Sequence, residues 1–355
     1  MRFHLTTEQA AIQDTLKGAL ADVFPLDRLH ALADSEADFD QPSWDALMAL
    51  GLGGLALPEA DGGMGLGLVE LALAAEALGM GAAPGAFADH LAAGLAIAAS
   101  SDPQARRHLP DLATGAIVAT TAFGGQWLPE SWTAELGDGR LTGEMRFVAG
   151  ATAADLFVVG TAGGGLALVG RGEGVTLSAV RSTDRSRRLS TVTFSGAPAI
   201  ALLAAGDAAV GRIFDAALVL CAADSLGGAQ RILDMSVGYA KEREQFGQPI
   251  GRFQALKHQL AQMALEVEPS RALVWYAAHA WDARLDDSSR TAALAKAHLS
   301  DRFVSVARAG VAAHGGIGYT WEYGLAHWFR RSVFNRAWLG SPAMHRARAA
   351  LLGGW

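Results

Sequence analysis

The sequence predicts a mainly helical α+β protein with an N-terminal helical domain, a central antiparallel β domain and a C-terminal four-helix bundle. The chain has 355 residues, of which 51% are hydrophobic, and this is enough to fill the cores of two or three domains. Helical periodicity dominates both ends of the chain, whereas its middle consists of short β-type runs. We therefore expect three domains, at 1–114, 115–205 and 206–355.

The N-terminal part opens with a helix-start signal. Thr6, followed three residues later by Gln9, forms a capping-box pattern. Apolar residues at positions 12, 16, 20 and 23 then recur at the spacing of one helical face. Further helical patterns cover 43–50 and 69–78, with a glycine-rich loop at 58–65 between them. This part of the chain is therefore expected to be all-helical.

The middle and the C-terminal parts differ in periodicity. Short runs rich in Val, Thr and Phe, bounded by Gly and Asp, are typical of strands in a small antiparallel domain. The clearest of these runs are 156–159, 166–169, 175–177 and 191–194. Helical periodicity returns at Asp207. The four long patterns that follow, at 207–241, 253–283, 289–314 and 325–352, predict a helical bundle.

Composition excludes several classes of protein. With 29 basic and 36 acidic residues the net charge is -7, which argues against affinity for nucleic acid through phosphate neutralisation. The single cysteine, Cys221, forms no internal disulfide and favours a cytoplasmic location. Polar residues, Gly and Pro interrupt the two longest uncharged runs, 112–129 and 189–206, so we expect no membrane span. The start at Met1–Thr6 lacks an apolar h-region, so we expect no export signal.

General catalytic motifs are missing or incomplete. The ten histidines are scattered, without HExxH or CxxC, and we assign no metal. The letters GxGxxA at 51–56 follow a helix instead of a strand, which disfavours a Rossmann site. The segment 314–318 is similar to an esterase oxyanion loop, but without a GxSxG elbow an esterase is the least favoured alternative. Four arginines, at 181, 185, 187 and 188, are interpreted as a solvated basic turn, with contact to a nucleotide phosphate as the alternative.

Three local motifs, in order, resemble those of the acyl-CoA dehydrogenase family. The segment 239–250, followed by Phe253 and Gln254, is similar to the signature Tyr-x-x-x-Arg-x-x-Phe-Gly-x-x-Ile and its glutamine. The segment 309–319 resembles the second signature, around a Gly-Gly-x-Gly turn, and 57–65 resembles the N-terminal Pro-Glu-x-x-Gly-Gly-x-Gly loop. The resemblance covers nearly the whole chain and is strongest from 238 to 346. It implies the three-domain order already expected from periodicity.

The resemblance also implies a cofactor and a reaction. Members of this family oxidise an acyl-CoA thioester at Cα–Cβ, with FAD taking a hydride from Cβ while a carboxylate removes the Cα proton. Carried over, Arg243 would contact the FAD pyrophosphate, and Phe246 and Gln254 would contact its adenosine half. Gly315 and Gly316 would let backbone approach the nucleotide closely. In the family these groups reach FAD bound mainly by a neighbouring subunit, so a tetramer is implied.

Departures from the family pattern are as informative as matches. Where the β domain begins, the family's flavin-contacting serine motif is replaced by Thr120–Trp127, and Thr121 stays a candidate for that contact. The flavin-packing Trp-Ile-Thr segment becomes Phe147-Val148-Ala149, which keeps an aromatic residue without the hydroxyl. The usual catalytic glutamate position aligns with Leu339, and the alternative position on the first bundle helix aligns with Ala217. Neither residue accepts a proton.

Asp224 and Asp215 are the weak remaining candidates for a base, and either carboxylate could equally bind backbone or solvent. The tail 339–346 resembles a glutamate-less subunit that pairs with a glutamate-bearing one in steroid-type dehydrogenases, and its His345 is expected to be structural. We therefore predict an FAD-dependent acyl-CoA dehydrogenase subunit that acts on acyl-CoA and passes electrons to an electron-transfer flavoprotein or similar acceptor. The alternatives are a self-sufficient enzyme with a relocated base and a non-catalytic FAD- or CoA-binding partner.

Overall fold

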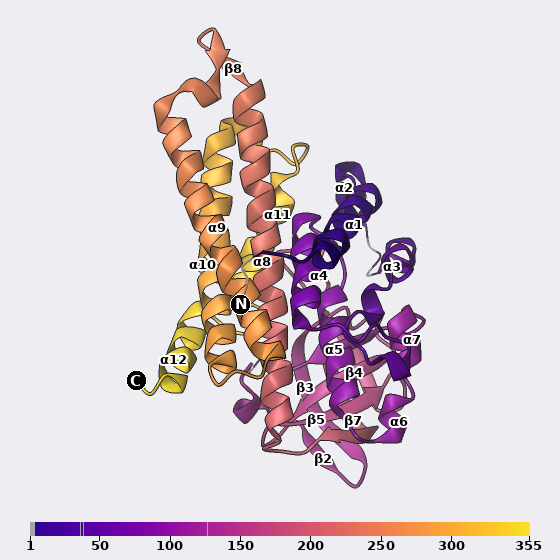
Figure 1. Cartoon of the computed structure of the whole chain (residues 1–355). Helices are drawn as coiled ribbons and strands as arrows, with labels where there is room; N and C mark the ends of the chain where they lie inside the picture. Colours follow the sequence, from indigo (N-terminus) through magenta and orange to yellow (C-terminus); the bar gives the residue numbers. More distant parts are fainter. Residues whose placement is uncertain (1–3, 36, 38, 126) are drawn as a thin grey trace.

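The computed structural model describes residues 4–35, 37, 39–125 and 127–355 (Figure 1). The first three residues of the N-terminus, where no export signal is expected, and Gln126 of the segment 120–127 lie outside the described residues.

The N-terminal part is helical, as expected. Its helices are α1 (Thr7–Val23), α2 (Leu26–Asp34), α3 (Gln41–Met48), α4 (Leu68–Met80), α5 (Phe87–Ala99), α6 (Pro103–Arg106) and α7 (Leu109–Thr114). The capping box is confirmed, because the backbone N–H of Gln9 donates to Thr6 Oγ1 and the backbone N–H of Thr6 donates to Gln9 Oε1. Sequence periodicity missed α5, which is buried on nearly every side and therefore carries no polar stripe.

The central sheet contains the strands β1 (Ala119–Ala122), β2 (Glu135–Gly137), β3 (Arg140–Ala149), β4 (Leu156–Thr161), β5 (Gly165–Gly170), β6 (Val175–Val180) and β7 (Leu189–Leu203). Their order is β1-β4-β5-β7-β3-β2, with β6 also paired to β7. The expected antiparallel arrangement holds for every pair except β1 and β4, which run parallel. The β2–β3 hairpin lies between β1 and β4 in the chain and lets β4 enter in the same direction as β1, so the sheet is mixed.

The C-terminal bundle consists of α8 (Ala208–Glu242), α9 (Gln254–Asp282), α10 (Ser288–His314) and α11 (Leu325–Ala337), followed by α12 (Pro342–Leu352). A single last helix over 325–352 was expected, but the chain breaks after Ala337. Leu339 has a left-handed φ of 56°, and Pro342 then starts α12, so one helix cannot continue through the segment. A small hairpin of β8 (Glu244–Gln245) and β9 (Gln248–Pro249) joins α8 to α9 at the far end of the bundle from the sheet (Figure 1).

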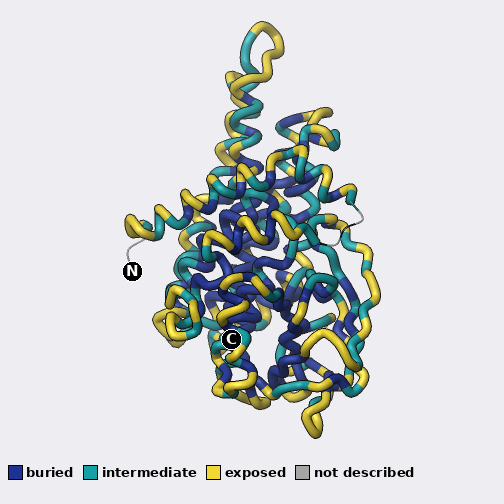
Figure 2. The backbone as a smooth tube through the Cα atoms, turned by 90° about the vertical axis from the view of Figure 1, so that its right-hand side faces the viewer, coloured by how far each residue is buried: buried dark blue, intermediate teal, exposed yellow. Residues whose placement is uncertain are grey.

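The N-terminal helices pack directly on the bundle. Gly79 of α4 and Gly227 of α8 face each other's helix so closely that a Cβ on either would overlap a backbone carbonyl, of Asp224 and Glu76 respectively. Asp282 of α9 caps the start of α4 by accepting from the Leu68 and Val69 amides at 2.7 and 3.0 Å. Buried residues run through this contact, whereas the hairpin at the bundle tip is exposed (Figure 2).

The described part of the chain contains no helix with the combined length and apolarity that a bilayer crossing needs. Within the same residues, no group of three or more His, Cys, Asp or Glu side chains is placed to hold a metal ion.

Candidate active site

A small cavity brings Leu339 close to Ala217 and Asp224 of α8, which lie much earlier in the sequence. It has a volume of about 30 Å³ and lies where α5, α8 and the α11–α12 connection meet. Ala217, Asp224 and Leu339 line it, so both positions that the resemblance aligns with the family base, and one of the two remaining base candidates, face the same space. The other lining residues are Ala88, Asp89, Ala92, Arg187, Cys221, Phe334, Asn335 and Trp338.

Two buried side chains fix the turn that carries Leu339 through hydrogen bonds to its backbone carbonyls. His345 donates from Nε2 to the Leu339 carbonyl at 2.7 Å, since a carbonyl only accepts. Lys296 of α10 donates from Nζ to the carbonyls of Asn335 and Gly340 at 2.9 and 3.2 Å. Burial lowers the pKa of His345 to about 4, so its ring is neutral at pH 7. These contacts fix a left-handed residue that is not glycine, with its buried side chain at the cavity wall.

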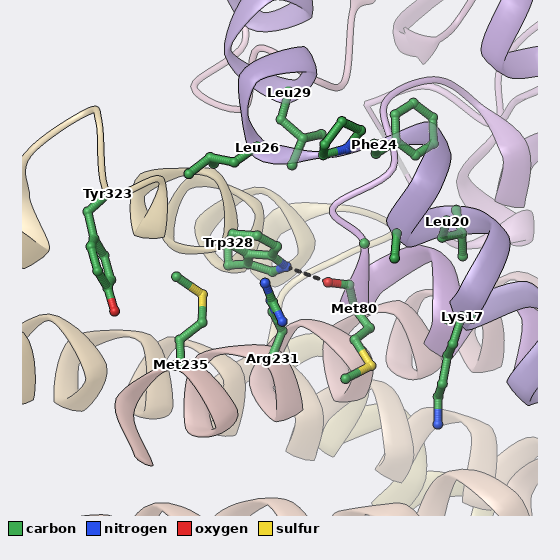
Figure 3. A pocket seen from close by; sticks show the side chains of 14 residues that line it. Lys17, Leu20, Phe24, Leu26, Leu29, Met80, Arg231, Met235, Tyr323 and Trp328 are labelled. Atoms are coloured by element: carbon green, nitrogen blue, oxygen red, sulfur yellow. Dashed lines mark hydrogen bonds between the residues drawn. The ribbon is translucent and has the colours of Figure 1, made fainter. Parts of the chain in front are cut away.

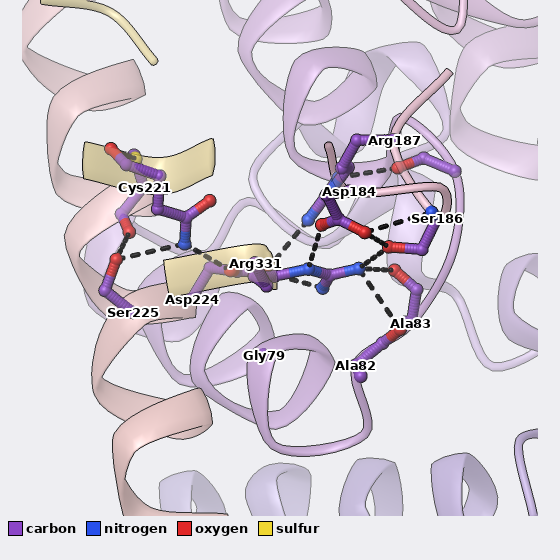
Figure 4. Close-up of polar contacts among 12 residues, drawn as sticks. Gly79, Ala82, Ala83, Asp184, Ser186, Arg187, Cys221, Asp224, Ser225 and Arg331 are labelled. Atoms are coloured by element: carbon purple, nitrogen blue, oxygen red, sulfur yellow. Dashed lines mark hydrogen bonds and ion pairs between the residues drawn. The ribbon is translucent and has the colours of Figure 1, made fainter. Parts of the chain in front are cut away.

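Asp224 is the centre of a buried ion network (Figure 4). Its Oδ2 accepts from Arg187 Nη2 at 2.9 Å and from Arg331 Nη1 at 3.3 Å, and its Oδ1 accepts from Asn335 Nδ2 at 2.7 Å. Both carboxylate oxygens are therefore engaged, two of the three donors being guanidinium groups. A carboxylate so paired has no free oxygen facing the cavity to take a proton from a substrate.

The same network joins the three parts of the chain. Arg331 of α11 is fully buried and bonds to Asp184 Oδ2 at 3.1 Å. It also donates to the carbonyls of Ala82 and Ala83 at 3.1 and 2.9 Å (Figure 4). Ser186 Oγ, from the β6–β7 loop, accepts from the same guanidinium at 2.6 Å. One arginine thus ties the bundle to the sheet and to the N-terminal helices.

This loop corrects the interpretation of residues 181–188 as a solvated basic turn. Arg187 is buried and binds Asp224 and the Gly85 carbonyl. Arg185 does stay exposed, in an ion pair with Asp34. The spacing of the four arginines gave no sign of this difference, because the partners of Arg187 come from α8 and from the segment before α5.

Asp215 does not line the cavity. Its carboxylate accepts from Ser289 Oγ at 2.6 Å and from Arg348 Nη2 at 2.7 Å, toward α10 and α12. Asp89, which sequence reasoning missed, does line it. Asp89 Oδ1 accepts from the Thr121 hydroxyl at 2.9 Å, which also ties a candidate flavin residue to the cavity. The signal that could have found Asp89 is a charged residue within the otherwise apolar segment 86–99.

Cys221, the remaining titratable group on the wall, is a neutral thiol. Burial raises its pKa to about 11, so the thiolate needed for nucleophilic attack is absent near neutral pH.

The residues proposed to contact FAD lie in two groups. The first group is at the bundle tip, where Arg243 ends α8 and Gln254 starts α9. Phe246, in the hairpin between them, is 92% exposed. Gly315 and Gly316 follow α10, and no atom lies within 4 Å of a Cβ built on either. Tyr239 stacks on His314 at 4.8 Å between ring centroids, which sets the two signature segments side by side.

The second group lies in the sheet. Thr121 is on β1, and Phe147 is at a register shift of β3, with a left-handed φ of 58°. The two strands are tied where Thr120 Oγ1 donates to the Ala149 carbonyl at 2.7 Å. The sheet and the hairpin at the tip are at opposite ends of the molecule (Figure 1), so one chain does not bring the two groups together.

Two larger cavities lie elsewhere. One, of about 250 Å³, is bounded by α1, α2, α4, α8 and α11 and is mostly apolar, with Lys17 and Arg231 among its lining residues (Figure 3). None of the proposed site residues lines it. The other has a volume of about 320 Å³. Its lining includes Gly318 and Tyr319, directly after the glycine turn, and also Arg308 and Arg330. The second cavity therefore places two cations beside the proposed nucleotide-contacting turn.

Comparison with known proteins gives a consistent picture. Residues 6–116 match the family model for the acyl-CoA dehydrogenase N-terminal domain, and residues 206–351 match the model for the C-terminal domain. The acyl-CoA dehydrogenase IpdE2 of Mycolicibacterium smegmatis is 30% identical over 339 residues, which is 95% of this chain and 96% of that protein.

Solved structures agree with the sequence relatives. A variant of the Tcur3481-Tcur3483 steroid ACAD superposes with a TM-score of 0.91 at 32% identity and covers 98% of both chains. The ChsE4-ChsE5 complex from Mycobacterium tuberculosis gives a TM-score of 0.88 at 26% identity, over 99% of this chain and 98% of that one.

Proposed function

Because the chain belongs to the acyl-CoA dehydrogenase family, we propose that it is an FAD-dependent subunit that oxidises acyl-CoA thioesters at Cα–Cβ, and that it works beside a glutamate-bearing subunit. The observation that carries the proposal is the cavity where Ala217 and Leu339 meet, since both family base positions face it and neither side chain accepts a proton. The names of two similar structures, a steroid ACAD and a two-component complex, support a steroid-type thioester and a mixed oligomer.

The residues at the bundle tip fit a flavin that is shared between subunits. Arg243 and Phe246 are exposed, and Gly315 and Gly316 leave open space around their Cα atoms. An exposed guanidinium suits a pyrophosphate, and an exposed ring suits an adenine. Thr121 and Phe147 would contact the flavin of their own chain. This division supports a tetramer, homomeric or mixed.

When bound, FAD accepts the hydride that leaves Cβ. The chain's own contribution is to hold the nucleotide through the two groups and to receive the acyl end of the thioester at the cavity. Electrons would then pass to an electron-transfer flavoprotein or a similar acceptor. A cytoplasmic location stays a prediction from the single cysteine.

The first test adds the missing carboxylate. Leu339→Glu, or separately Ala217→Glu, should raise turnover of acyl-CoA by up to about 10²-fold, because a general base in reach of the α-proton contributes about 10²- to 10⁴-fold in rate. The measurement is steady-state reduction of an artificial acceptor, with straight-chain and steroid-derived thioesters.

Leu339→Gln is the matched control, because glutamine has nearly the same shape as glutamate and cannot act as the base. The absorption spectrum of each purified protein reports bound flavin. A colourless protein that cannot be reconstituted with FAD would favour the non-catalytic partner, and flavin-loaded variants with unchanged turnover would refute the assignment of the base positions.

A further inference from the structure

We infer that Asp89 is the group that accepts the α-proton of a thioester bound in this subunit's cavity. The inference rests on the proposed binding of flavin and acyl-CoA, and it concerns the slower proton removal that this subunit carries out without a glutamate at position 217 or 339. It replaces Asp224 and Asp215 as the candidate for a relocated base.

The first support is the inventory of acids around the cavity. Among the described residues that line it, the carboxylates are Asp89 and Asp224. Asp224 is bound on both oxygens by Arg187, Arg331 and Asn335. Both oxygens of that carboxylate are therefore occupied by buried donors, and neither is left for the α-proton. This leaves Asp89 as the carboxylate with capacity to accept a proton.

The second support is the hydrogen bonding of Asp89 itself. Thr121 donates to Oδ1, and no described side chain donates to Oδ2. Asp89 lies in the first turn of α5, where its negative charge is favoured by the helix dipole. Arg187, which also lines the cavity, has its Nε buried without a hydrogen-bond partner among the described residues. The cavity lining thus holds both an available carboxylate oxygen and an unsatisfied donor.

Burial, together with the nearby charges, sets the basicity of Asp89. Burial raises its pKa to about 6, against the lowering effects of the Arg187 charge and the Thr121 hydroxyl, and the Asp224 charge raises it further. The Cys221 thiol, on the same wall of α8, is uncharged near neutral pH. At pH 7 most Asp89 side chains are therefore carboxylates, with a proton affinity close to the operating pH, as a general base requires.

The step balances with the oxidant of the proposed function. The Cα–H bond breaks and its proton goes to Asp89 Oδ2. The electron pair left on Cα forms the second Cα–Cβ bond as the Cβ–H bond breaks and the hydride leaves for the flavin ring. Proton removal alone, without hydride transfer, is the part that depends on Asp89.

The test separates proton removal from oxidation. The probes are acetyl-CoA and phenylacetyl-CoA, which have α-hydrogens and no Cβ hydrogen that could leave as hydride. The flavin-loaded protein is incubated with each probe in deuterated water, and deuterium at Cα is measured by mass spectrometry. The wild type should exchange these hydrogens, with a rate that rises through about pH 6 and levels off above it.

Asp89→Asn should lower the exchange rate by about 10²-fold while the flavin spectrum is kept, and Asp89→Glu should retain part of it. Asp215→Asn is the matched control, a buried aspartate outside the cavity, and should leave the rate unchanged. Exchange that is undiminished in Asp89→Asn would overturn the inference. So would a flavin-loaded wild type that shows no exchange, or a rate independent of pH between 5 and 8. Failure to bind flavin or CoA would instead defeat the proposed function.

Discussion

At the scale of single residues, partners in space decide the role of each ionisable group. Asp89 and Asp224 are both buried aspartates on the same cavity, yet one has a single hydroxyl partner and the other is held by two guanidiniums. Arg331 shows the extreme case, since all three nitrogens of its guanidinium have partners from other segments and the residue has no exposed surface. Such a residue acts as a connector, and its loss leaves charges without compensation.

Arg331→Met should therefore lower the free energy of unfolding by about 3–5 kcal/mol, since breaking a buried ion pair leaves Asp184 and Asp224 undercompensated. Arg185→Met is the control. It removes an arginine of the β6–β7 loop whose pair with Asp34 is exposed, so the change should stay below about 1 kcal/mol. Urea unfolding at pH 7 measures both variants. Equal losses in the two would show that the network adds nothing beyond a surface pair.

At the scale of elements, the crossing of α4 and α8 depends on missing side chains. Gly79 and Gly227 let the helices approach until their backbones are in contact. The same approach helps to place the cavity, because Gly79 of α4 lies against the backbone of Asp224, which lines the cavity. Backbone contact between α4 and α8 therefore fixes the position of the α8 residues that line the cavity.

Gly227→Ala tests this crossing. The added Cβ overlaps the Glu76 carbonyl on α4, and the variant should lose about 1–3 kcal/mol of stability as the helices separate. Gly238→Ala, on the same helix with no atom within 4 Å of its Cβ, should instead gain about 0.5–1 kcal/mol from helix propensity. Thermal unfolding followed by circular dichroism gives both values. A stabilised Gly227→Ala would show that the crossing tolerates a wider spacing.

At the scale of the whole molecule, buried histidines set the response to acid. Burial lowers the pKa of His90, His327 and His345 to about 4 from an ordinary 6.5. Between pH 4 and pH 6.5 the unfolded chain binds more protons at these histidines than the folded chain does. The stability that the neutral histidines contribute is therefore complete above pH 6.5 and is lost as the pH falls toward 4. Asp89 has the opposite sign: its raised pKa favours folding below pH 3.8, a benefit that is lost as the pH rises through about 6.

Three histidines outweigh one aspartate, so the protein should lose stability when the pH falls from 7 to 5, by about 2 kcal/mol for each histidine. Urea midpoints at pH 7, 6 and 5 measure the loss. In His90→Gln the stability lost between pH 7 and pH 5 should be smaller by the contribution of one histidine. This comparison holds whatever the stability of the variant at pH 7. Equal midpoints at pH 7 and pH 5 would contradict the effect.

Local sequence by itself determined the order of helical, strand and helical segments. Apolar periodicity and caps act within a few residues, so the Thr6–Gln9 box and the long patterns of α8, α9 and α10 could be read directly. The hypothesis that the catalytic glutamate is missing also rests on local sequence, because the side chains of Ala217 and Leu339 carry no group that accepts a proton. The antiparallel expectation failed only where β1 meets β4, a pairing between strands that are not neighbours in the chain.

Tertiary structure alone decided which residues share the cavity. Asp89 comes from a helix without a polar stripe, and Arg187 comes from a loop whose four arginines look alike in sequence. The left-handed backbone at Leu339 depends on His345 and Lys296, whose contacts form only when α10, α11 and α12 are packed together. Burial then moves the pKa of Asp89 upward and those of the histidines downward, because the cost of charge depends on the surrounding dielectric and the nearby charges, which a residue acquires only in the folded chain.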